Sequence, residues 1–571
     1  MRFVALATDY DGTLAHDGEV PGPGVEALDR FLASGRKLIL VTGRELDELS
    51  GIFPAIDRFD CVVAENGALL YFPKSGEREV LCEPPPEAFA RTLRERGVPI
   101  AVGAAIVATV EPHETAVLEA IRDLGLELQV IFNKGAVMVL PASVNKATGL
   151  AHALTRMGLS AHNVAAIGDA ENDHALLHAV EYGVAVANAI PTLKDSADHV
   201  SALARTDAVI ELIDRIVGHD LRETPPRRPR HRVLLGQRED GAAVEVDAYA
   251  RGLLIAGSSG SGKSTLATGV LERLCEQRYQ FCVIDPEGDY ENFQPGIVFG
   301  NGERAPGADE VLSALEKPDT NAIVNLIALP LNDRPAFFLD LLPRLHTLRA
   351  STGRPHWILV DETHHLMPHD WDAAPTILAQ QPGGMLYVTV HPEWIAPAAL
   401  EGIEAVAILG EAPLQSIAAV AASVGLPAPA GPTAPLAPGQ ALFWRPGAPE
   451  AVRFEVAGQR TQRRRHRRKY AEGELPEDRS FWFRGPQGKL RLRAQNLFVF
   501  LQMGEGVDED TWLHHLRAHD YSRWMREFIK DPHLGDEVAS IERDAGLSAE
   551  ESRRRVREAV ERHYTLPAAS G

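Results

Sequence analysis

The sequence predicts an α/β protein with two parallel-sheet domains and a mainly helical C-terminal domain. Short apolar runs alternate with helical stretches over residues 1–220, and the same alternation returns over residues 231–458. It is lost from residue 475 to the end, where aromatic, Arg and Glu residues are frequent. Alternating strands and helices are typical of parallel sheets, because each crossover between parallel strands needs a helix. A chain of 571 residues is long enough for about three or four domains.

Composition and charge narrow the class of partner. The net charge of −21 opposes general nucleic-acid binding, because affinity for the phosphate backbone depends on Lys and Arg. Nucleic acid could bind only through the basic runs at residues 227–232 and 463–469. We expect both runs to be solvated linkers, since blocks of like charge repel; docking is the alternative.

Targeting signals and cysteine usage indicate the compartment. No apolar stretch approaches the roughly 20 residues that span a bilayer, and the N-terminus lacks a signal-peptide pattern. The four cysteines lack metal-ligand spacing, so we expect reduced thiols. We therefore expect a cytoplasmic protein without a membrane partner.

Two aspartates follow the first expected strand. Residues 3–7 are apolar and lead into D-Y-D-G-T, which contains Asp9 and Asp11. Open parallel sheets bind ligands at the carboxyl ends of their strands. Two carboxylates two residues apart can divide the work, one attacking phosphorus and the other transferring protons.

Three later strand ends carry matching chemistry. Thr42 can form a hydrogen bond to a phosphoryl oxygen, and Lys146 can balance the charge of phosphate and nucleophile. Asp169 and Asp173 offer oxygen ligands for Mg²⁺. A single aspartate at a strand end is often only a turn residue. Four polar strand ends in order favour a phosphoryl-transfer site instead.

This ordered set resembles the haloacid dehalogenase superfamily of phosphatases over about residues 1–215. The resemblance implies a Rossmann-like core, a Mg²⁺ cofactor and an aspartyl-phosphate intermediate. It also implies a role for each matching residue. Asp9 would be the nucleophile, Asp11 the general acid/base, Thr42 and Lys146 the phosphoryl-binding residues, and Asp9, the Asp11 carbonyl, Asp169 and Asp173 the metal ligands.

Two further segments, residues 65–68 and 183–189, are similar to the Cof-type branch of that superfamily. This similarity implies a small α/β cap at about residues 83–140. In that branch the cap selects the substrate, so the expected partner is a small phosphorylated molecule.

A second phosphate signature follows the apolar run at residues 253–256. It reads G-S-S-G-S-G-K-S and precedes a helical stretch over residues 265–277, which is the context of a P-loop. Its backbone N–H groups can cradle the phosphates of ATP; Lys263 would reach the β- and γ-phosphates and Ser264 would bind Mg²⁺. An ordinary Gly/Ser turn is the alternative. The expected nucleotide-binding residues are Gly257, Ser258, Ser259, Gly260, Ser261, Gly262, Lys263, Ser264 and Thr265.

An acidic pair follows the strand expected at residues 357–360. Asp361 would support Mg²⁺, and Glu362 could polarise the attacking water. With the D-P-E-G-D-Y run at residues 285–290, these motifs resemble the HerA/FtsK group of motor ATPases over residues 231–458. The resemblance implies ATP binding, ATP hydrolysis and a homo-oligomer, either a ring or a dimer. His391 is a candidate γ-phosphate sensor, and the candidates for an arginine finger are Arg334, Arg344 and Arg349.

The C-terminal part, residues 475–571, is expected to be a helical accessory domain. Its aromatic and Arg residues near 481–486 and 520–524 could stack on bases, but we favour a small core. His515 and His519 are four residues apart on an expected helix, yet no third metal ligand is evident.

These motifs together predict a Mg²⁺-dependent phosphomonoester hydrolase coupled to an ATP-binding and ATP-hydrolysing domain. A kinase-phosphatase that processes nucleic-acid ends is one alternative, and an ATP-dependent assembly scaffold is another. The acidic run at 285–290 and the pair Asp361-Glu362 favour attack by water over a kinase reaction.

Overall fold

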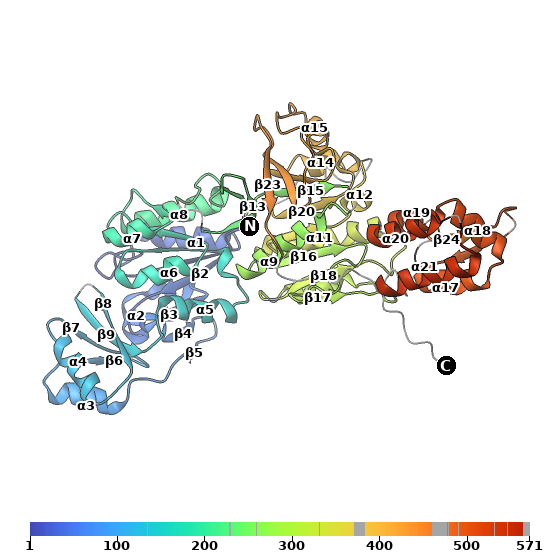
Figure 1. The fold of residues 1–571 in the computed structure, drawn as a ribbon. Coiled ribbons are helices and arrows are strands. Elements are labelled where there is room, and N and C mark those ends of the chain that lie inside the picture. The colour runs from blue at the N-terminus through green and yellow to red at the C-terminus, as the bar shows by residue number, and fades with distance from the viewer. Residues whose placement is uncertain are drawn as a thin grey trace. The chain divides into compact units, whose positions relative to one another are not determined.

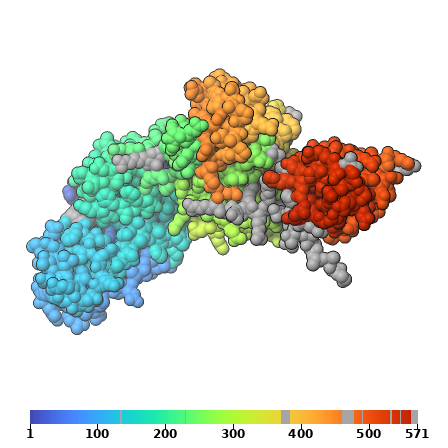
Figure 2. Space-filling view, in the orientation of Figure 1, coloured from blue at the N-terminus to red at the C-terminus, as the bar shows by residue number. Residues whose placement is uncertain are grey.

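The computed structural model describes most of the chain. The described residues are 1–133, 135–227, 230–258, 260–330, 332–369, 383–459, 475, 477, 479–488, 490–529, 531–544 and 546–563. The basic run at 463–469 and Ser259 therefore lie outside the described residues. The chain divides into two compact units, Met1–Gly257 with Lys263–Gly458 and Ser258–Gly262 with Gln459–Gly571. In Figures 1 and 2 the helices of the C-terminal part are red.

The first sheet is parallel around a central strand, with the order β12-β11-β10-β1-β2-β3-β4-β5. Strand order reverses at β1, which pairs in parallel with β2 on one side and β10 on the other. Its strands are β1 (Ala5–Thr8), β2 (Lys37–Val41), β3 (Cys61–Ala64), β4 (Leu69–Phe72), β5 (Glu77–Val80), β10 (Val164–Gly168), β11 (Tyr182–Ala185) and β12 (His199–Val200). Its helices are α1 (Gly22–Ala33), α2 (Leu46–Ile52), α5 (Lys146–Arg156), α6 (His174–Ala179), α7 (Pro191–Ser196) and α8 (Arg205–His219). The reversal places a crevice for ligand at the carboxyl end of β1.

A small antiparallel sheet, here called the cap, is inserted between β5 and α5. Its order is β6-β7-β9-β8, and the helices α3 and α4 pack on one face through Phe89, Leu93 and Val117. Its elements are α3 (Glu87–Glu95), β6 (Ala101–Val102), β7 (Val107–Val110), α4 (Glu114–Asp123), β8 (Leu128–Asn133) and β9 (Ala136–Pro141). These elements lie in the range where the sequence predicts a cap, although the domain bounds themselves stay a prediction.

The second large sheet has the order β14-β13-β23-β22-β21-β15-β20-β19-β16-β18-β17. The strands from β21 to β17 are parallel to one another. The strands are β13 (Arg232–Gln237), β14 (Ala243–Asp247), β15 (Gly252–Gly257), β16 (Phe281–Asp285), β17 (Gly296–Phe299), β18 (Asn321–Asn325), β19 (Trp357–Val360), β20 (Met385–Thr389), β21 (Ala405–Leu409), β22 (Gln440–Trp444) and β23 (Val452–Val456). The helices are α9 (Lys263–Glu276), α10 (Ala308–Leu315), α11 (Arg334–Thr352), α12 (Thr363–Leu366), α14 (Pro397–Leu400) and α15 (Pro413–Ser423).

One strand of this sheet is shorter than the sequence predicts. The apolar run at residues 322–327 predicts a strand, but β18 ends at Asn325, because the Asn325 side chain accepts the N–H of Ile327 at 2.9 Å and turns the chain. The α/β class is as expected, but both sheets are mixed: β4 and β5 in the first and β22, β23, β13 and β14 in the second are antiparallel additions at the edge.

The C-terminal part is mainly helical, as predicted, with α17 (Leu497–Gly506), α18 (Glu509–Arg517), α19 (Asp520–Glu527), α20 (Pro532–Glu542), α21 (Ala549–His563) and a hairpin of β24 (Phe481–Phe483) and β25 (Leu492–Ala494). Its aromatic residues form a core: the Phe481 ring lies 5.3 Å from Tyr521 and 5.4 Å from Trp524. His515 bonds to the N–H of Arg484 and to Asp520 through its two ring nitrogens, which leaves neither nitrogen for a metal. Of the described helices, none has both the length and the apolar character to cross a bilayer.

The basic run at 227–232 is not a solvated linker where it is described, so that prediction is wrong. Arg230 forms an ion pair with Asp198 and donates to the carbonyls of Leu177 at 3.2 Å and Val180 at 3.0 Å. Arg232 begins β13. A guanidinium has five donors, so a half-buried Arg can pair with several carbonyls that a sequence pattern does not reveal.

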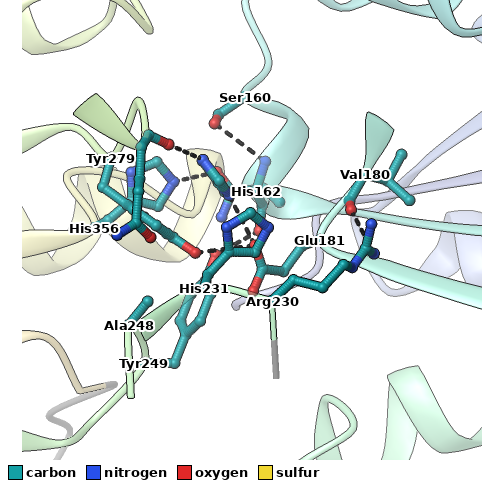
Figure 3. A network of polar contacts seen from close by, with 12 residues as sticks. Ser160, His162, Val180, Glu181, Arg230, His231, Ala248, Tyr249, Tyr279 and His356 are labelled. Atoms are coloured by element: carbon teal, nitrogen blue, oxygen red, sulfur yellow. Dashed lines mark hydrogen bonds and ion pairs between the residues drawn. The ribbon is translucent and has the colours of Figure 1, made fainter. Parts of the chain in front are cut away.

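Glu181 is the centre of a polar joint between the two large sheets (Figure 3). Its buried carboxylate accepts hydrogen bonds from Arg2 at 3.2 Å, from Tyr279 at 3.0 Å and from His162 Nδ1 at 2.7 Å. The other His162 nitrogen, Nε2, donates to the carbonyl of Gln277 at 2.6 Å. His231 lies nearby and would complete a set of metal donors, but both ring nitrogens of His162 already have partners.

A second set of contacts extends this joint. His356 Nε2 lies 3.1 Å from Oδ1 of Asn163, and Arg354 donates to the carbonyl of Gly158 at 2.8 Å. Residues 162 and 163 precede β10, Tyr279 precedes β16 and His356 precedes β19. The joint therefore holds the amino ends of strands from both sheets, and their carboxyl ends point away from it. With five residues in each of β10 and β16, each strand is about 16 Å long.

We expect Glu181→Ala to weaken this joint. Burial alone would raise the pKa of Glu181, but the His162 hydrogen bond and the charge of Arg2 hold it below its ordinary value. The stabilisation is thus present at neutral pH and is lost as the pH falls through the folded pKa. Removing one partner of a buried ion pair costs about 3–5 kcal/mol.

Calorimetric unfolding at pH 7 checks this expectation. The matched control is Asp214→Ala, which removes an exposed ion pair with Arg30 and should cost about 0–1 kcal/mol. Equal losses in the two variants would show that the carboxylate of Glu181 does not hold the joint.

Candidate active sites

The first sheet brings four polar side chains together at its carboxyl edge. Asp9 follows β1, Thr42 follows β2, and Asp169 follows β10. Lys146 is the first residue of α5, whose start is fixed by Asn145, because that side chain accepts the N–H groups of two residues in the first turn. All four side chains are buried.

Lys146 joins two of the carboxylates. Its Nζ donates to Oδ1 of Asp9 and to Oδ1 of Asp173, each at 2.6 Å. The other oxygen of Asp173 accepts the N–H of Asp169 at 2.9 Å and of Ala170 at 3.0 Å. A Cβ at Gly168 would lie 2.6 Å from Cγ of Asp173, so glycine is required for this approach. The loop after β10 is thereby fixed against the ammonium group.

The site carries more negative than positive charge. The pKa of Asp9 is raised to about 7, chiefly by burial and also by the charges of Asp173 and Asp169, against the opposing effect of Lys146. Burial alone would lower the pKa of Lys146, but Asp173 and Asp9 outweigh it and raise this pKa. Oxygens of Asp9, Asp169 and Asp173 lie within 4.8 Å of one another. Three carboxylates sharing one ammonium group suit a hard divalent cation such as Mg²⁺.

Asp11 is held by Arg44, for which the sequence pattern indicates no role. Arg44 donates from Nε to Oδ2 of Asp11 and from Nη2 to Oδ1, both at 2.7 Å. Its backbone N–H donates to Oγ1 of Thr42 at 3.1 Å. A two-point contact of this kind fixes the orientation of a carboxylate. The available signal was the position of Arg44 two residues after Thr42.

Asn188 is a second residue that the sequence reasoning missed. Its amide donates to the carbonyl of Gly12 at 2.8 Å and to Oδ2 of Asp169 at 3.4 Å. Thr13 Oγ1 approaches the other oxygen of Asp169 at 3.4 Å. These contacts join the loops after β1, β10 and β11. Asn188 lies in the segment 183–189, whose similarity to the Cof-type branch is visible in the sequence. The sequence does not indicate that its side chain contacts Asp169.

The P-loop signature lies between β15 and α9. Gly257, Gly260 and Gly262 have φ values of 149°, 79° and 103°, which residues with side chains rarely adopt. Lys263 is the first residue of α9, and Ser264 and Thr265 follow in its first turn. Exposed N–H groups at a helix start favour a phosphate.

The acidic residues after β16 and β19 lie close enough for their charges to interact. Burial raises the pKa of Asp361 well above its ordinary value, and Glu362, Asp289 and Asp285 add to the effect. Asp285 accepts the N–H of Asp289 at 3.0 Å with Oδ1 and of Tyr290 at 2.9 Å with Oδ2. Glu362 has a φ of 43°, a conformation that costs a non-glycine residue on the order of 1–3 kcal/mol and is typical of functional sites.

Thr389 is a further candidate for a residue of the nucleotide site. It ends β20, which lies between the P-loop strand β15 and the acidic strand β19. Its buried hydroxyl lies 3.0 Å from Nδ1 of His364 and accepts the N–H of His391 at 3.0 Å. The His391 ring stacks on Trp394 at 3.8 Å. The role of His391 as a γ-phosphate sensor stays a prediction. Thr389 is the buried polar residue at the end of β20.

The three arginine-finger candidates differ in environment. Arg349 is buried and donates to the carbonyls of Pro355 and Gly383, both at 2.7 Å, so it is not available to a neighbouring subunit. That part of the prediction is wrong. Arg344 is partly exposed and pairs with Asp309 and Asp340, and Arg334 donates to the carbonyl of Leu329 at 3.0 Å.

Comparison with known proteins identifies the first sheet. Residues 6–90 and 105–213 match the family model described as haloacid dehalogenase-like hydrolase. Phosphoglycolate phosphatase of Methanothermobacter thermautotrophicus is 32% identical over 223 residues, which are 38% of this chain and 99% of that relative. The chain belongs to the haloacid dehalogenase-like hydrolases. The hydrolase domain is also similar to phosphoglycolate phosphatase 2 of Saccharolobus solfataricus. The two sequences are 30% identical over 226 residues, which are 38% of this chain and 92% of that relative.

The second large sheet has its own match. Residues 235–343 match the family model described as the central domain of helicase HerA. A solved structure was also compared with the chain. It is a haloacid dehalogenase-like hydrolase from Bacteroides thetaiotaomicron, and it aligns at 21% identity and a TM-score of 0.35, covering 38% of this chain and 99% of that one. The chain thus joins a haloacid dehalogenase-like hydrolase domain to a domain that matches the HerA central-domain model over residues 235–343.

We expect Asp169→Asn to weaken divalent-cation binding in the hydrolase domain. The change removes one of three clustered carboxylates, and loss of even an outer partner of a metal ligand typically costs about 10- to 100-fold in affinity. Titration with Mn²⁺ in the absence of nucleotide, followed by electron paramagnetic resonance, measures the dissociation constant. Asp207→Asn, on the exposed side of α8, is the matched control. Unchanged Mn²⁺ affinity in Asp169→Asn would contradict the assignment.

Proposed function

We propose that the hydrolase domain cleaves phosphomonoesters through an aspartyl-phosphate formed on Asp9. The observation that carries this proposal is the contact of Asp9 with Lys146, together with an oriented Asp11 two residues later. A buried carboxylate beside an ammonium group and a second carboxylate that can exchange protons form the pair that two-step displacement needs.

The chain's own groups account for both steps. Asp9 attacks phosphorus, and Asp11 gives a proton to the leaving oxygen. Asp11 then takes a proton from the water that attacks the acyl phosphate, and the carboxylate of Asp9 is regenerated. Lys146 and Thr42 bind phosphoryl oxygens and hold them for attack in line. Mg²⁺, held by Asp9, Asp169, Asp173 and the Asp11 carbonyl, would offset the charge of the phosphoryl group.

We propose that the HerA-type domain binds and hydrolyses ATP. Lys263 and Ser264 would bind phosphates and Mg²⁺, Asp361 would support the metal, and Glu362 would polarise water. Attack by water is favoured over transfer to a hydroxyl acceptor, because both Asp285 oxygens already accept backbone N–H groups. A kinase-phosphatase is the second candidate. Its support is that one chain contains both a P-loop domain and a phosphatase-like domain.

We infer that the two sites act on separate substrates. The joint at Glu181 holds the amino ends of both sheets, and each site lies at the opposite, carboxyl end of its strands. A shared intermediate would have to travel past two strand lengths, on the order of 30 Å. The joint is therefore the candidate route for any coupling between the two sites. A ring or dimer of the HerA-type domain is proposed on similarity alone, and native mass spectrometry with and without ATP tests it.

We expect Asp9→Asn and Lys263→Ala to separate the two activities. Asp9→Asn removes the nucleophile, so it should abolish phosphate release from a panel of phosphomonoesters and spare ATP hydrolysis. Lys263→Ala removes the phosphate-binding ammonium group, so it should weaken ATP binding by at least about 10-fold and spare the phosphatase. Phosphate release and nucleotide titration measure both. If Asp9→Asn retains phosphatase activity, another nucleophile is used.

We expect Glu362→Gln to keep ATP binding and to lose hydrolysis, because the amide keeps the shape of the side chain but cannot polarise water in the same way. Binding of a fluorescent ATP analogue and release of phosphate from ATP measure the two properties separately. Wild-type hydrolysis in this variant would remove Glu362 from the reaction. Transfer of a labelled γ-phosphate to a DNA or RNA 5′ end would favour the kinase-phosphatase instead.

A further inference from the structure

A buried carboxylate of the hydrolase core binds a loop of the cap. Glu65 follows β3 and accepts the N–H groups of Ala104 at 2.9 Å and Ala105 at 2.7 Å, which lie between β6 and β7 of the cap. Glu65 has a φ of 50°, a left-handed conformation that side-chain residues adopt at a cost of about 1–3 kcal/mol. A buried carboxylate that accepts two N–H groups fixes the position of the cap loop.

Strand β9 of the cap places Met138 beside the phosphoryl-binding loop. A Cβ added to Gly43 would lie 3.3 Å from Sδ of Met138 and 3.7 Å from Nδ2 of Asn172. Gly43 directly follows Thr42, and Asn172 directly precedes Asp173. Met138 is therefore a cap side chain at the opening of the site, and a leaving group attached to a bound phosphoryl group would meet it.

Most described residues on this face of the cap are apolar. Val107, Val137 and Val139 pack toward the cap helices, so the alternating residues of the same strands lie on the opposite face. On that face Met138 and Leu140 pack in a cluster with core residue Ala68, and Ala108 and Ile131 border it. Gln129, opposite Leu140 on β8, is the polar exception, and its amide donates to the carbonyl of Val144. Beside Met138, the neighbours Ala108 and Ile131 offer methyl and methylene groups to a substrate.

The arginines of the cap's described residues lie elsewhere. Arg91 and Arg94 are on α3, which packs on the helix-covered face of the sheet through Phe89 and Leu93. Arg96 pairs with Asp123 and Glu119, and Arg122 also pairs with Asp123. These three ion pairs belong to the outer, helical side of the cap.

The core side of the opening is acidic. Arg44, the cation nearest to Thr42 in sequence, is paired with Asp11 and Glu48. Burial raises the pKa of Glu45, and the charges of Glu65 and Glu48 add to the effect. A carboxylate on the leaving group would lose water against the apolar cap and meet like charge at this rim, and both effects disfavour it.

We propose that this site selects phosphomonoesters whose leaving group is uncharged and apolar next to the ester oxygen, with Met138 as a specificity-determining residue. The proposal rests on the phosphatase function proposed above. It separates this chain from the relatives named phosphoglycolate phosphatase, because phosphoglycolate carries a carboxylate one carbon from the ester oxygen.

Two esters of similar size test the proposal on the full-length protein. n-Propyl phosphate replaces the carboxylate of phosphoglycolate with an ethyl group. We expect kcat/KM to be at least about 10-fold higher for n-propyl phosphate, within the range of 10- to 200-fold that apolar pocket contacts give. Met138→Lys places a cation at the opening and should reduce this ratio by at least about 10-fold, mainly through KM for phosphoglycolate, whereas Met138→Leu should keep it.

Leu118→Lys is the matched control. Leu118 is 53% exposed on α4, on the far side of the cap sheet, so the same added charge should leave the ratio unchanged. A ratio that favours phosphoglycolate in the wild-type protein overturns the proposal, even where Met138→Lys does not fold. An unchanged ratio in a folded Met138→Lys variant removes Met138 from specificity.

The same assay separates the two levels of inference. If neither ester nor 4-nitrophenyl phosphate gives Asp9-dependent phosphate release, the proposed phosphatase function fails, and the substrate inference fails with it. If Asp9-dependent release occurs and phosphoglycolate is the better substrate, only the substrate inference fails.

Discussion

The hydrolase site depends on one buried ammonium group. Lys146 lies between Asp9 and Asp173, and without it three carboxylates would share a desolvated pocket. Burying a charge is costly unless it is paired, so the lysine and the carboxylates hold each other in place. The position of Asp173 in turn fixes the backbone of Asp169 and Ala170 through two N–H contacts. The ammonium group thus orders the strand-end loops and leaves a negative excess that a divalent cation would offset.

The joint around Glu181 has a different consequence. It uses the amino ends of β10, β16 and β19, which are the ends that carry no candidate site in either sheet. A parallel sheet collects ligand-binding loops at its carboxyl edge, so joining amino edges leaves both sites open. The physical cost is a set of buried polar groups that must all be paired, and Arg2, His162, Tyr279 and Gln277 supply the partners. The arrangement suits two activities in one chain that do not exchange an intermediate.

The sequence predicted the strands and their terminal motifs well, because both depend on local patterns. The runs before Asp9 and Gly257 are apolar and short, and parallel strands must bring their ends together. What it could not predict depends on contacts between distant residues. Arg44 reaches Asp11 across 33 positions, and Arg230 pairs with Asp198 across 32. The environment of Arg349 was also hidden, since an arginine on a helix looks alike in sequence whether it faces carbonyls or solvent. For the aromatic residues near 481 the sequence favoured a core over a stacking surface, and their rings do pack together.

The central claim is that Asp9 becomes phosphorylated during turnover. Rapid acid quenching of the protein with a phosphomonoester, followed by peptide mass spectrometry, measures this directly, because an acyl phosphate survives in acid long enough to be detected. The expected result is the added mass of one phosphoryl group on the peptide that contains Asp9, absent in Asp9→Asn. Phosphate release with an unmodified Asp9 peptide, or with the added mass on another residue, would contradict the account.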